Sequence, residues 1–137
     1  MSTWKDVKRI ALALPETEEV HRGTTLWRVR DKLFVWERPL RPSDLRALGD
    51  QAPRGAILGV RVESLVAKEA RLAAQPDVLF TTPHFDGYPA VLVRLGKIKV
   101  SDLEELLVEA WLARAPKRLA KEYLGEPGKP TARLRDS

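Results

Sequence analysis

The stretch that decides the fold is Leu26-Trp27-Arg28-Val29-Arg30-Asp31-Lys32-Leu33-Phe34-Val35-Trp36, residues 26–36. Two runs rich in aromatic and β-branched residues flank the dipeptide Asp31-Lys32, a pattern typical of a β-hairpin. With Asp31 and Lys32 as the two turn residues, Trp27 lies opposite Trp36 and Arg28 lies opposite Val35. A slip of this pairing by one residue would exchange the two faces of the hairpin.

This pairing assigns the hairpin side chains to two faces of a sheet. We expect the face under the helices to carry Trp27, Val29, Phe34 and Trp36, and the other face to carry Arg28, Arg30, Leu33 and Val35. The same alternation places Arg61 and Arg94 on that second face. Arginines among aliphatic neighbours indicate either a solvated face, with the side chains lying flat, or a binding or dimerisation face.

Elements on both sides of the hairpin extend the pattern. Apolar residues recur at helical spacing over 3–14, 64–74 and from 101 up to Pro116, and further strands are predicted over 56–62, 78–81 and 90–95. Residues 43–48 and 117–124 favour shorter helical segments. The main elements thus follow the order α-β-β-β-α-β-β-α. Consecutive strands joined by short loops predict a two-layer α+β fold, in which an antiparallel sheet carries its helices on one face.

The composition indicates one domain without covalent staples. The chain has 137 residues, 44% of them hydrophobic, and no cysteine, which excludes disulfides and thiol chemistry. We expect a single domain over 1–124 and a mobile basic C-terminal tail over 125–137, where Gly, Pro and charged residues dominate. No signal peptide and no apolar stretch long enough to cross a membrane is evident, so we expect a cytoplasmic protein and no membrane partner.

The positive charge is concentrated at the C-terminal end. The formal net charge is +5 and the pI is near 9.7. Residues 114–137 hold seven basic and three acidic residues, a net charge of +4, whereas residues 1–113 hold 17 basic and 16 acidic residues, a net charge of +1. The basic pI therefore describes mainly the last two dozen residues.

The sequence contains no pattern that indicates catalysis, a metal or a cofactor. No serine lies in a Gly-x-Ser-x-Gly elbow, neither His21 nor His84 has metal-binding spacing, and no glycine-rich phosphate loop is present. We expect no catalytic residue, no metal and no cofactor.

The loop over 81–89 is the best candidate for a ligand site. It gathers an imidazole, a carboxylate and two aromatic rings between prolines, in His84, Phe85, Asp86 and Tyr88. The competing interpretation, which we favour, is a hairpin loop that packs on the domain through Phe85 and Tyr88.

Several short stretches resemble the MmcQ/YjbR family. They are Ala11-Leu12-Ala13-Leu14-Pro15-Glu16, Lys32-Leu33-Phe34, Pro83-His84-Phe85 with Gly87-Tyr88, and Ala110-Trp111 with Ala115-Pro116-Lys117-Arg118-Leu119. The resemblance covers about residues 4–120 and implies a secretion-chaperone-like or YjbR-like α+β fold. Members are often labelled DNA-binding, largely by analogy of fold. One departure is Tyr88-Pro89-Ala90, where a Gly-Trp pair entering the strand is expected.

Two functions remain open from the sequence. The first is a non-enzymatic module that binds DNA, mainly through its phosphates. The residues expected to contact phosphates are Lys97, Lys99, Lys117, Arg118 and Lys121, with Arg28, Arg30, Arg61 and Arg94 on the sheet. The second is a module that uses the open sheet face to bind another protein or a second copy of itself.

Overall fold

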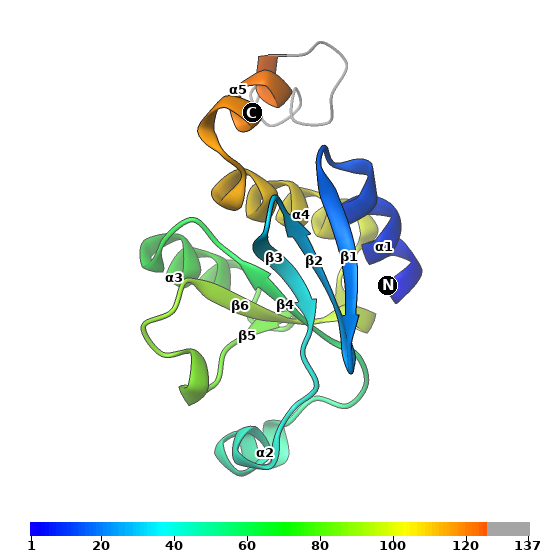
Figure 1. Cartoon of the computed structure of the whole chain (residues 1–137). Coiled ribbons are helices and arrows are strands. Elements are labelled where there is room, and N and C mark those ends of the chain that lie inside the picture. Colours follow the sequence, from blue (N-terminus) through cyan, green and yellow to red (C-terminus); the bar gives the residue numbers. More distant parts are fainter. Residues whose placement is uncertain (126–137) are drawn as a thin grey trace.

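The computed structural model describes residues 1–125 of the chain (Figure 1). Its helices and strands follow the order α1 (Trp4–Ala13), β1 (Thr17–Arg22), β2 (Thr24–Val29), β3 (Lys32–Glu37), α2 (Pro42–Leu48), β4 (Ile57–Arg61), α3 (Leu65–Ala74), β5 (Leu79–Phe80), β6 (Ala90–Arg94), α4 (Val100–Arg114) and α5 (Lys117–Gly125). Three short 3-10 turns, η1 (Gly49–Gln51), η2 (Pro83–Phe85) and η3 (Leu95–Lys97), connect them. The domain predicted over 1–124 lies within this range, whereas the predicted tail, apart from Gly125 in α5, lies outside it.

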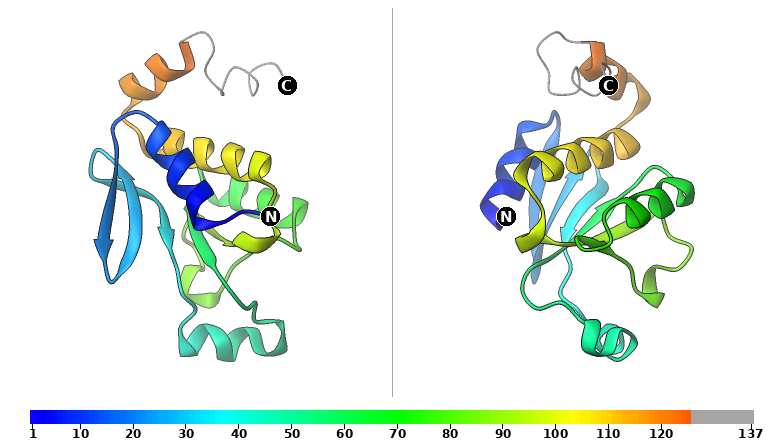
Figure 2. Two further views of the ribbon diagram at one scale, coloured as in Figure 1. Left: turned by 90° about the vertical axis from the view of Figure 1, so that its right-hand side faces the viewer. Right: turned by 180° about the vertical axis from the view of Figure 1, so that it is seen from behind.

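The strands form one antiparallel sheet in the order β1-β2-β3-β4-β6-β5. Helices α1, α3 and α4 cover one face, and α2 lies at the lower edge (Figure 2). The predicted α+β fold, with an antiparallel sheet and helices on one face, is confirmed. We call the face turned away from these helices the outer face; it is the face seen in Figure 1.

Residues 17–22 form a strand that the sequence analysis did not predict. Strand β1 pairs with β2 at the edge of the sheet, with Glu18 opposite Arg28 and Val20 opposite Leu26. Val20 is its one strongly apolar residue, so the alternation that identifies a half-buried strand is missing. Charged side chains suit an edge strand, because they discourage pairing with other chains. The sheet therefore has one strand more than the predicted order.

The hairpin turn lies one residue earlier than predicted. Val29 pairs with Lys32, so Arg30 and Asp31 are the turn residues, with φ of 42° and 70°. Positive φ at both positions matches the type I′ turn, whose twist suits an antiparallel hairpin.

A bulge in β3 then shifts the faces of the hairpin. Arg28 pairs with Leu33 but Trp27 pairs with Val35, which leaves Phe34 as the extra residue. Phe34 and Val35 are both buried against the helices, while Trp36 reaches the outer face and packs with its residues. The expected positions of Val35 and Trp36 were therefore wrong, whereas Trp27, Val29 and Phe34 do face the helices.

Two hydrophobic clusters stabilise the two faces. The main core lies between the sheet and the helices. It includes the fully buried residues Phe34, Leu58, Val93, Leu107 and Trp111. A smaller cluster on the outer face contains Ile57, Phe80, Phe85, Ala90 and Leu92, with Trp36, Leu40 and Leu48 packed against it. The outer face is thus partly covered near β4, β5 and β6 rather than fully open.

Within residues 1–125, we find no helix that combines the length and apolar character needed to cross a membrane.

Candidate functional site

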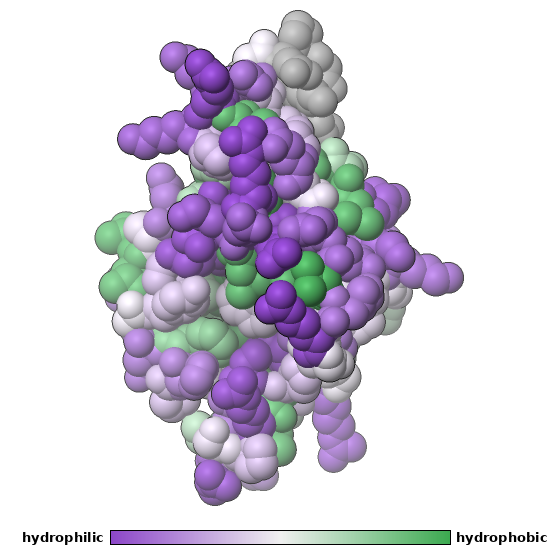
Figure 3. All heavy atoms as spheres, in the orientation of Figure 1, coloured by the Kyte–Doolittle hydropathy of each residue, from purple (hydrophilic) through white to green (hydrophobic). Residues whose placement is uncertain are grey.

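A groove of about 760 Å³ lies on the outer face, between the end of β3 and the loop over 82–89. We call it the outer groove; its walls include Trp36, Arg38, Arg41, His84, Phe85 and Tyr88. Seen from this side, hydrophobic patches lie between hydrophilic side chains (Figure 3). Three of the four residues predicted for a ligand loop, namely His84, Phe85 and Tyr88, line this groove, together with Trp36 of β3.

Trp36 occupies its place because residue 59 has no side chain. Trp36 pairs with Gly59 across β3 and β4. A Cβ atom at position 59 would lie 2.3 Å from the indole ring, so the ring rests directly on the β4 backbone. This close approach turns the half-buried indole into a wall of the groove.

Phe85 anchors the loop beneath the groove. It is 7% exposed, and its ring centroid lies 6.3 Å from that of Trp36 and 6.2 Å from that of Tyr88. The Arg38 guanidinium lies 5.3 Å from the Phe85 ring centroid, and the His84 ring meets its edge at 4.9 Å. Phe85 therefore packs on the domain, as the packing interpretation of the loop expected. Tyr88 does so only in part, because it is 41% exposed, and His84 and Asp86 are exposed.

A buried lysine fixes the loop from behind. Lys68 of α3 is 7% exposed, and its Nζ donates hydrogen bonds to the backbone carbonyls of Phe85, at 2.6 Å, and Tyr88, at 2.9 Å. Burial lowers the pKa of the Lys68 ammonium below its usual value, and the nearby Asp86 carboxylate opposes that shift. The two carbonyl oxygens give the buried ammonium group hydrogen-bond acceptors in place of water.

A buried ion pair holds Arg38 in position. Its Nη2 lies 3.0 Å from Oδ2 of Asp44, and the two side chains are 6% and 2% exposed. The Asp44 carboxylate also accepts the Arg41 backbone N–H at 2.8 Å, at the start of α2. Burial acts to raise the pKa of Asp44, but the Arg41 N–H and the Arg38 charge outweigh it and hold that pKa below its usual value. Arg38 therefore has a structural partner.

Two neighbouring arginines beside the groove have no such partner. The Arg61 guanidinium lies 5.0 Å from the Tyr88 ring centroid, and its Nη1 donates to the Tyr88 hydroxyl at 3.2 Å. Nε of Arg114, at the end of α4, donates to the Leu33 carbonyl at 3.1 Å. Burial lowers the pKa of Arg114, and the charge of Arg61 lowers it further. Among the described residues, no carboxylate forms an ion pair with either arginine.

The other arginines predicted on the sheet have internal contacts. Arg28 pairs with Glu18 at 2.6 Å, and Arg30 pairs with Glu16, whose pKa it lowers. Arg94 lies over the Phe80 ring, 4.7 Å from its centroid. Of the four predicted sheet arginines, Arg61 and Arg94 form no ion pair within residues 1–125, and Arg61 is the one that contacts Tyr88 of the groove.

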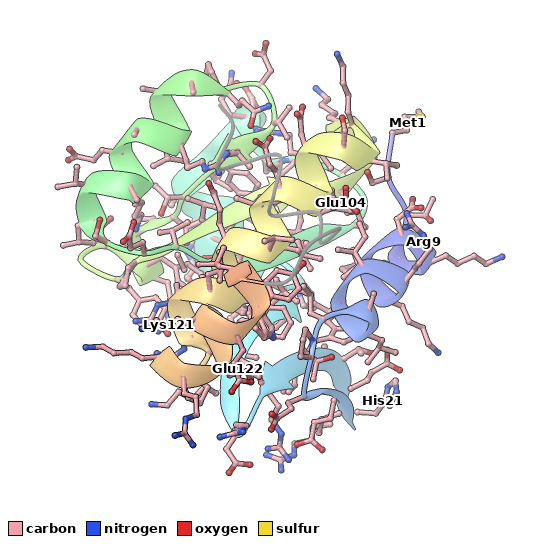
Figure 4. The ribbon with its side chains drawn as sticks, turned by 90° about the horizontal axis from the view of Figure 1, so that it is seen from above. Met1, Arg9, His21, Glu104, Lys121 and Glu122 are labelled. Carbon is pink, nitrogen blue, oxygen red and sulfur yellow. The ribbon has the colours of Figure 1, made fainter. Side chains whose placement is uncertain are left out.

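The predicted lysines fall into two separate groups. Lys117, Arg118 and Lys121 are exposed on α5, which follows Arg114 directly, and Figure 4 shows Lys121 there, away from Arg9 of α1. Lys97 and Lys99 precede α4, at its opposite end. Since α4 has 15 residues, the two ends lie about 22 Å apart. The α5 group thus follows Arg114 along the chain, whereas Lys97 and Lys99 lie at the opposite end of α4.

A family model described as YjbR matches residues 12–113, which include the whole outer groove. The chain belongs to the YjbR family.

Three mycobacterial relatives of this YjbR-family chain are described as uncharacterised. An uncharacterised protein of Mycobacterium bovis and two of Mycobacterium tuberculosis strains are each 55% identical to it over 131 residues, covering 93% of this chain and 100% of theirs. A crystal structure of a Deinococcus radiodurans protein with a DUF419 domain matches with a TM-score of 0.59 and 19% identity, covering 99% of this chain and 88% of that one. This structural similarity supports the α+β fold described above.

Proposed function

We propose that this protein is a non-enzymatic module that binds DNA through its outer face. Phosphate groups are contacted by Arg61 and Arg114, with Lys117, Arg118 and Lys121 of α5 extending the same surface. The observation that carries the proposal is that Arg61, which lies over the exposed Tyr88 ring, and Arg114, which donates to the Leu33 carbonyl, form no ion pair with a carboxylate among the described residues. A phosphate placed between them relieves their mutual repulsion and releases bound counterions.

Binding rather than catalysis is supported by the surroundings of His84. Its ring makes an edge-on contact with the Phe85 ring, and no hydrogen bond joins it to a carboxylate or a hydroxyl group within residues 1–125. The imidazole of a general base is commonly oriented by such a partner. A cytoplasmic location, where bacterial DNA is found, is part of the same proposal.

Fluorescence anisotropy with labelled DNA at low salt tests the proposal. We expect micromolar binding that weakens steeply with salt, with log K falling by about 0.9 per log unit of salt for each phosphate contacted. Arg61→Gln and Arg114→Gln should each weaken binding about fivefold or more and reduce the salt slope by about 1.

Arg9→Gln is the matched control. Arg9 is 59% exposed on α1, away from the outer face, so its loss removes the same charge from a distant surface. Equal losses from Arg9→Gln and Arg61→Gln, or no binding to duplex or single-stranded DNA at micromolar protein, contradict the proposal.

A homodimer or another protein partner on the same face is the alternative. It is favoured by Tyr88, which is 41% exposed beside the half-buried rings and aliphatic side chains of Trp36 and Leu33. Light scattering separates the two functions. A stable dimer that survives high salt and dissociates in Arg61→Glu supports the alternative, whereas a monomer that binds DNA supports the first proposal.

A further inference from the structure

The outer groove has the size of a small-molecule site. Its volume of about 760 Å³ falls within the range of roughly 300–1,000 Å³ typical of small-molecule sites. In duplex DNA the bases are stacked inside the helix, so a base enters such a groove only after unpairing. The groove therefore matches an unpaired nucleotide better than a double helix.

The walls of the groove present aromatic surface. Tyr88 is 41% exposed, Trp36 is half-buried with its ring supported by Gly59, and His84 is exposed. Every nucleobase has a flat π-face that stacks on such rings, and removal of one stacking ring weakens binding by about five- to hundredfold.

The aromatic surface is held rigidly before any ligand arrives. The Lys68 ammonium fixes the carbonyls of Phe85 and Tyr88, and Gly87 between them has φ of 75°, a conformation that glycine adopts without strain. A rigid site loses less conformational entropy on binding than a flexible one.

The charges around the groove suit an anion next to that base. Arg61 donates a hydrogen bond to the Tyr88 hydroxyl, and Arg41 lines the groove. Glu37 is the one acid among the described residues that line the groove, and its carboxylate accepts the Thr25 backbone N–H at 3.0 Å. A ligand that is aromatic and negatively charged complements this surface.

From these observations we propose that the outer groove holds one unpaired base of a nucleic-acid strand, stacked on Tyr88 and Trp36, with its phosphate on Arg61. The inference rests on the proposed function and deepens it, because it makes single-stranded DNA the preferred ligand. Arg114 and the cations of α5 then contact the phosphates of the neighbouring nucleotides along the strand.

The test compares three ligands of defined form. A labelled 15-nucleotide single strand and a 15-base-pair duplex are titrated by anisotropy, and an unlabelled nucleoside monophosphate serves as competitor. We expect the single strand to bind at least fivefold more tightly than the duplex. Tyr88→Ala should weaken single-strand binding about tenfold and duplex binding less than twofold, because the arginines remain.

Conservative variants separate stacking from folding. Tyr88→Phe keeps the ring and should retain single-strand affinity within about threefold, and Leu12→Ala, at a position of equal 41% exposure on α1, should change nothing. The single strand should quench tryptophan emission in the native protein, and Trp36→Phe should abolish that quenching. Trp27 and Trp111 are buried, and the half-buried Trp4 belongs to α1 and does not line the outer groove. Circular dichroism checks that each variant is folded.

Distinct results overturn the two proposals. Equal weakening of both ligands by Tyr88→Ala, duplex binding as tight as single-strand binding, or competition by the mononucleotide as strong as by the oligonucleotide overturns the stacking site. The proposed function still stands in those cases. Absence of binding to either DNA form overturns both.

Discussion

At the scale of single residues, the contact between Trp36 and Gly59 shapes the groove. A methyl group at position 59 would meet the indole at 2.3 Å, so either the ring leaves the outer groove or the β4 backbone shifts. We expect Gly59→Ala to lower the free energy of unfolding by about 2 kcal/mol, the usual cost of overpacking. Urea denaturation followed by circular dichroism measures this change.

A double-mutant cycle controls for the effect of the methyl group on the strand itself. In a Trp36→Leu background the obstacle is smaller, so Gly59→Ala should cost at least about 1 kcal/mol less than in the native protein. The same cost in both backgrounds would show that the indole contact does not explain the glycine.

The buried pair Arg38–Asp44 should make stability depend on acid. The pKa of Asp44 is held below its usual 3.8, so the native state binds the proton less readily than the unfolded state. The stabilisation is present above the unfolded pKa and is lost as pH falls through the lower native pKa. Asp44→Asn should therefore cost about 3 kcal/mol at neutral pH and make stability less sensitive to acid.

The exposed pair Arg28–Glu18 is the matched control for this prediction. Its side chains are 27% and 53% exposed, so Glu18→Gln should cost less than about 1 kcal/mol. Urea titrations at several pH values measure both variants. Similar losses for Glu18→Gln and Asp44→Asn would contradict the structural role of the buried pair.

At the scale of the elements, the β2–β3 turn carries residual strain. Asp31 has φ of 70°, and glycine adopts this conformation without the clash of a Cβ atom. We expect Asp31→Gly to stabilise the protein by about 0.5 kcal/mol. Gly87→Ala, at φ of 75°, should instead destabilise it by about 1 kcal/mol. Thermal denaturation compares the two; a less stable Asp31→Gly would contradict this account.

The same hairpin shows what a sequence predicts well and what it does not. Periodicity predicted the helices and the inner strands, because burial of one face imposes a regular pattern. The bulge at Phe34 breaks that pattern, because one extra residue in β3 exchanges the faces of the residues that follow it. The exposure of Trp36 depends on Gly59, 23 positions later, which no local pattern reveals.

The candidate site was predictable to a similar extent. The loop over 81–89 was identified from its own rings, prolines and glycine. Its support was missed, because Lys68 acts from α3 and the Arg38–Asp44 pair joins β3 to α2. A lysine in a helix and an arginine after a strand are ordinary surface residues in sequence, and Arg114 likewise gave no signal beyond a basic helix end.

At the scale of the whole molecule, α4 separates two basic regions. The end of α4 that leads into α5 lies nearer the outer face than its first turn, which lies toward the back of the molecule (Figure 2). Lys97 and Lys99 directly precede that first turn. The separation of about 22 Å exceeds the Debye length of about 8 Å at physiological ionic strength. A phosphate strand on the outer face therefore interacts little with the distant pair.

Two variants with the same loss of charge decide whether DNA responds to this placement or to net charge alone. Lys117→Gln with Arg118→Gln, and Lys97→Gln with Lys99→Gln, each remove two positive charges from exposed positions. We expect the α5 pair to weaken DNA binding about tenfold and to reduce the salt slope by about 1–2, whereas the pair before α4 changes affinity less than about twofold at physiological salt. Equal effects of the two variants would show that binding depends on the net charge of the protein. They would contradict the proposal that the outer face is the DNA-binding surface.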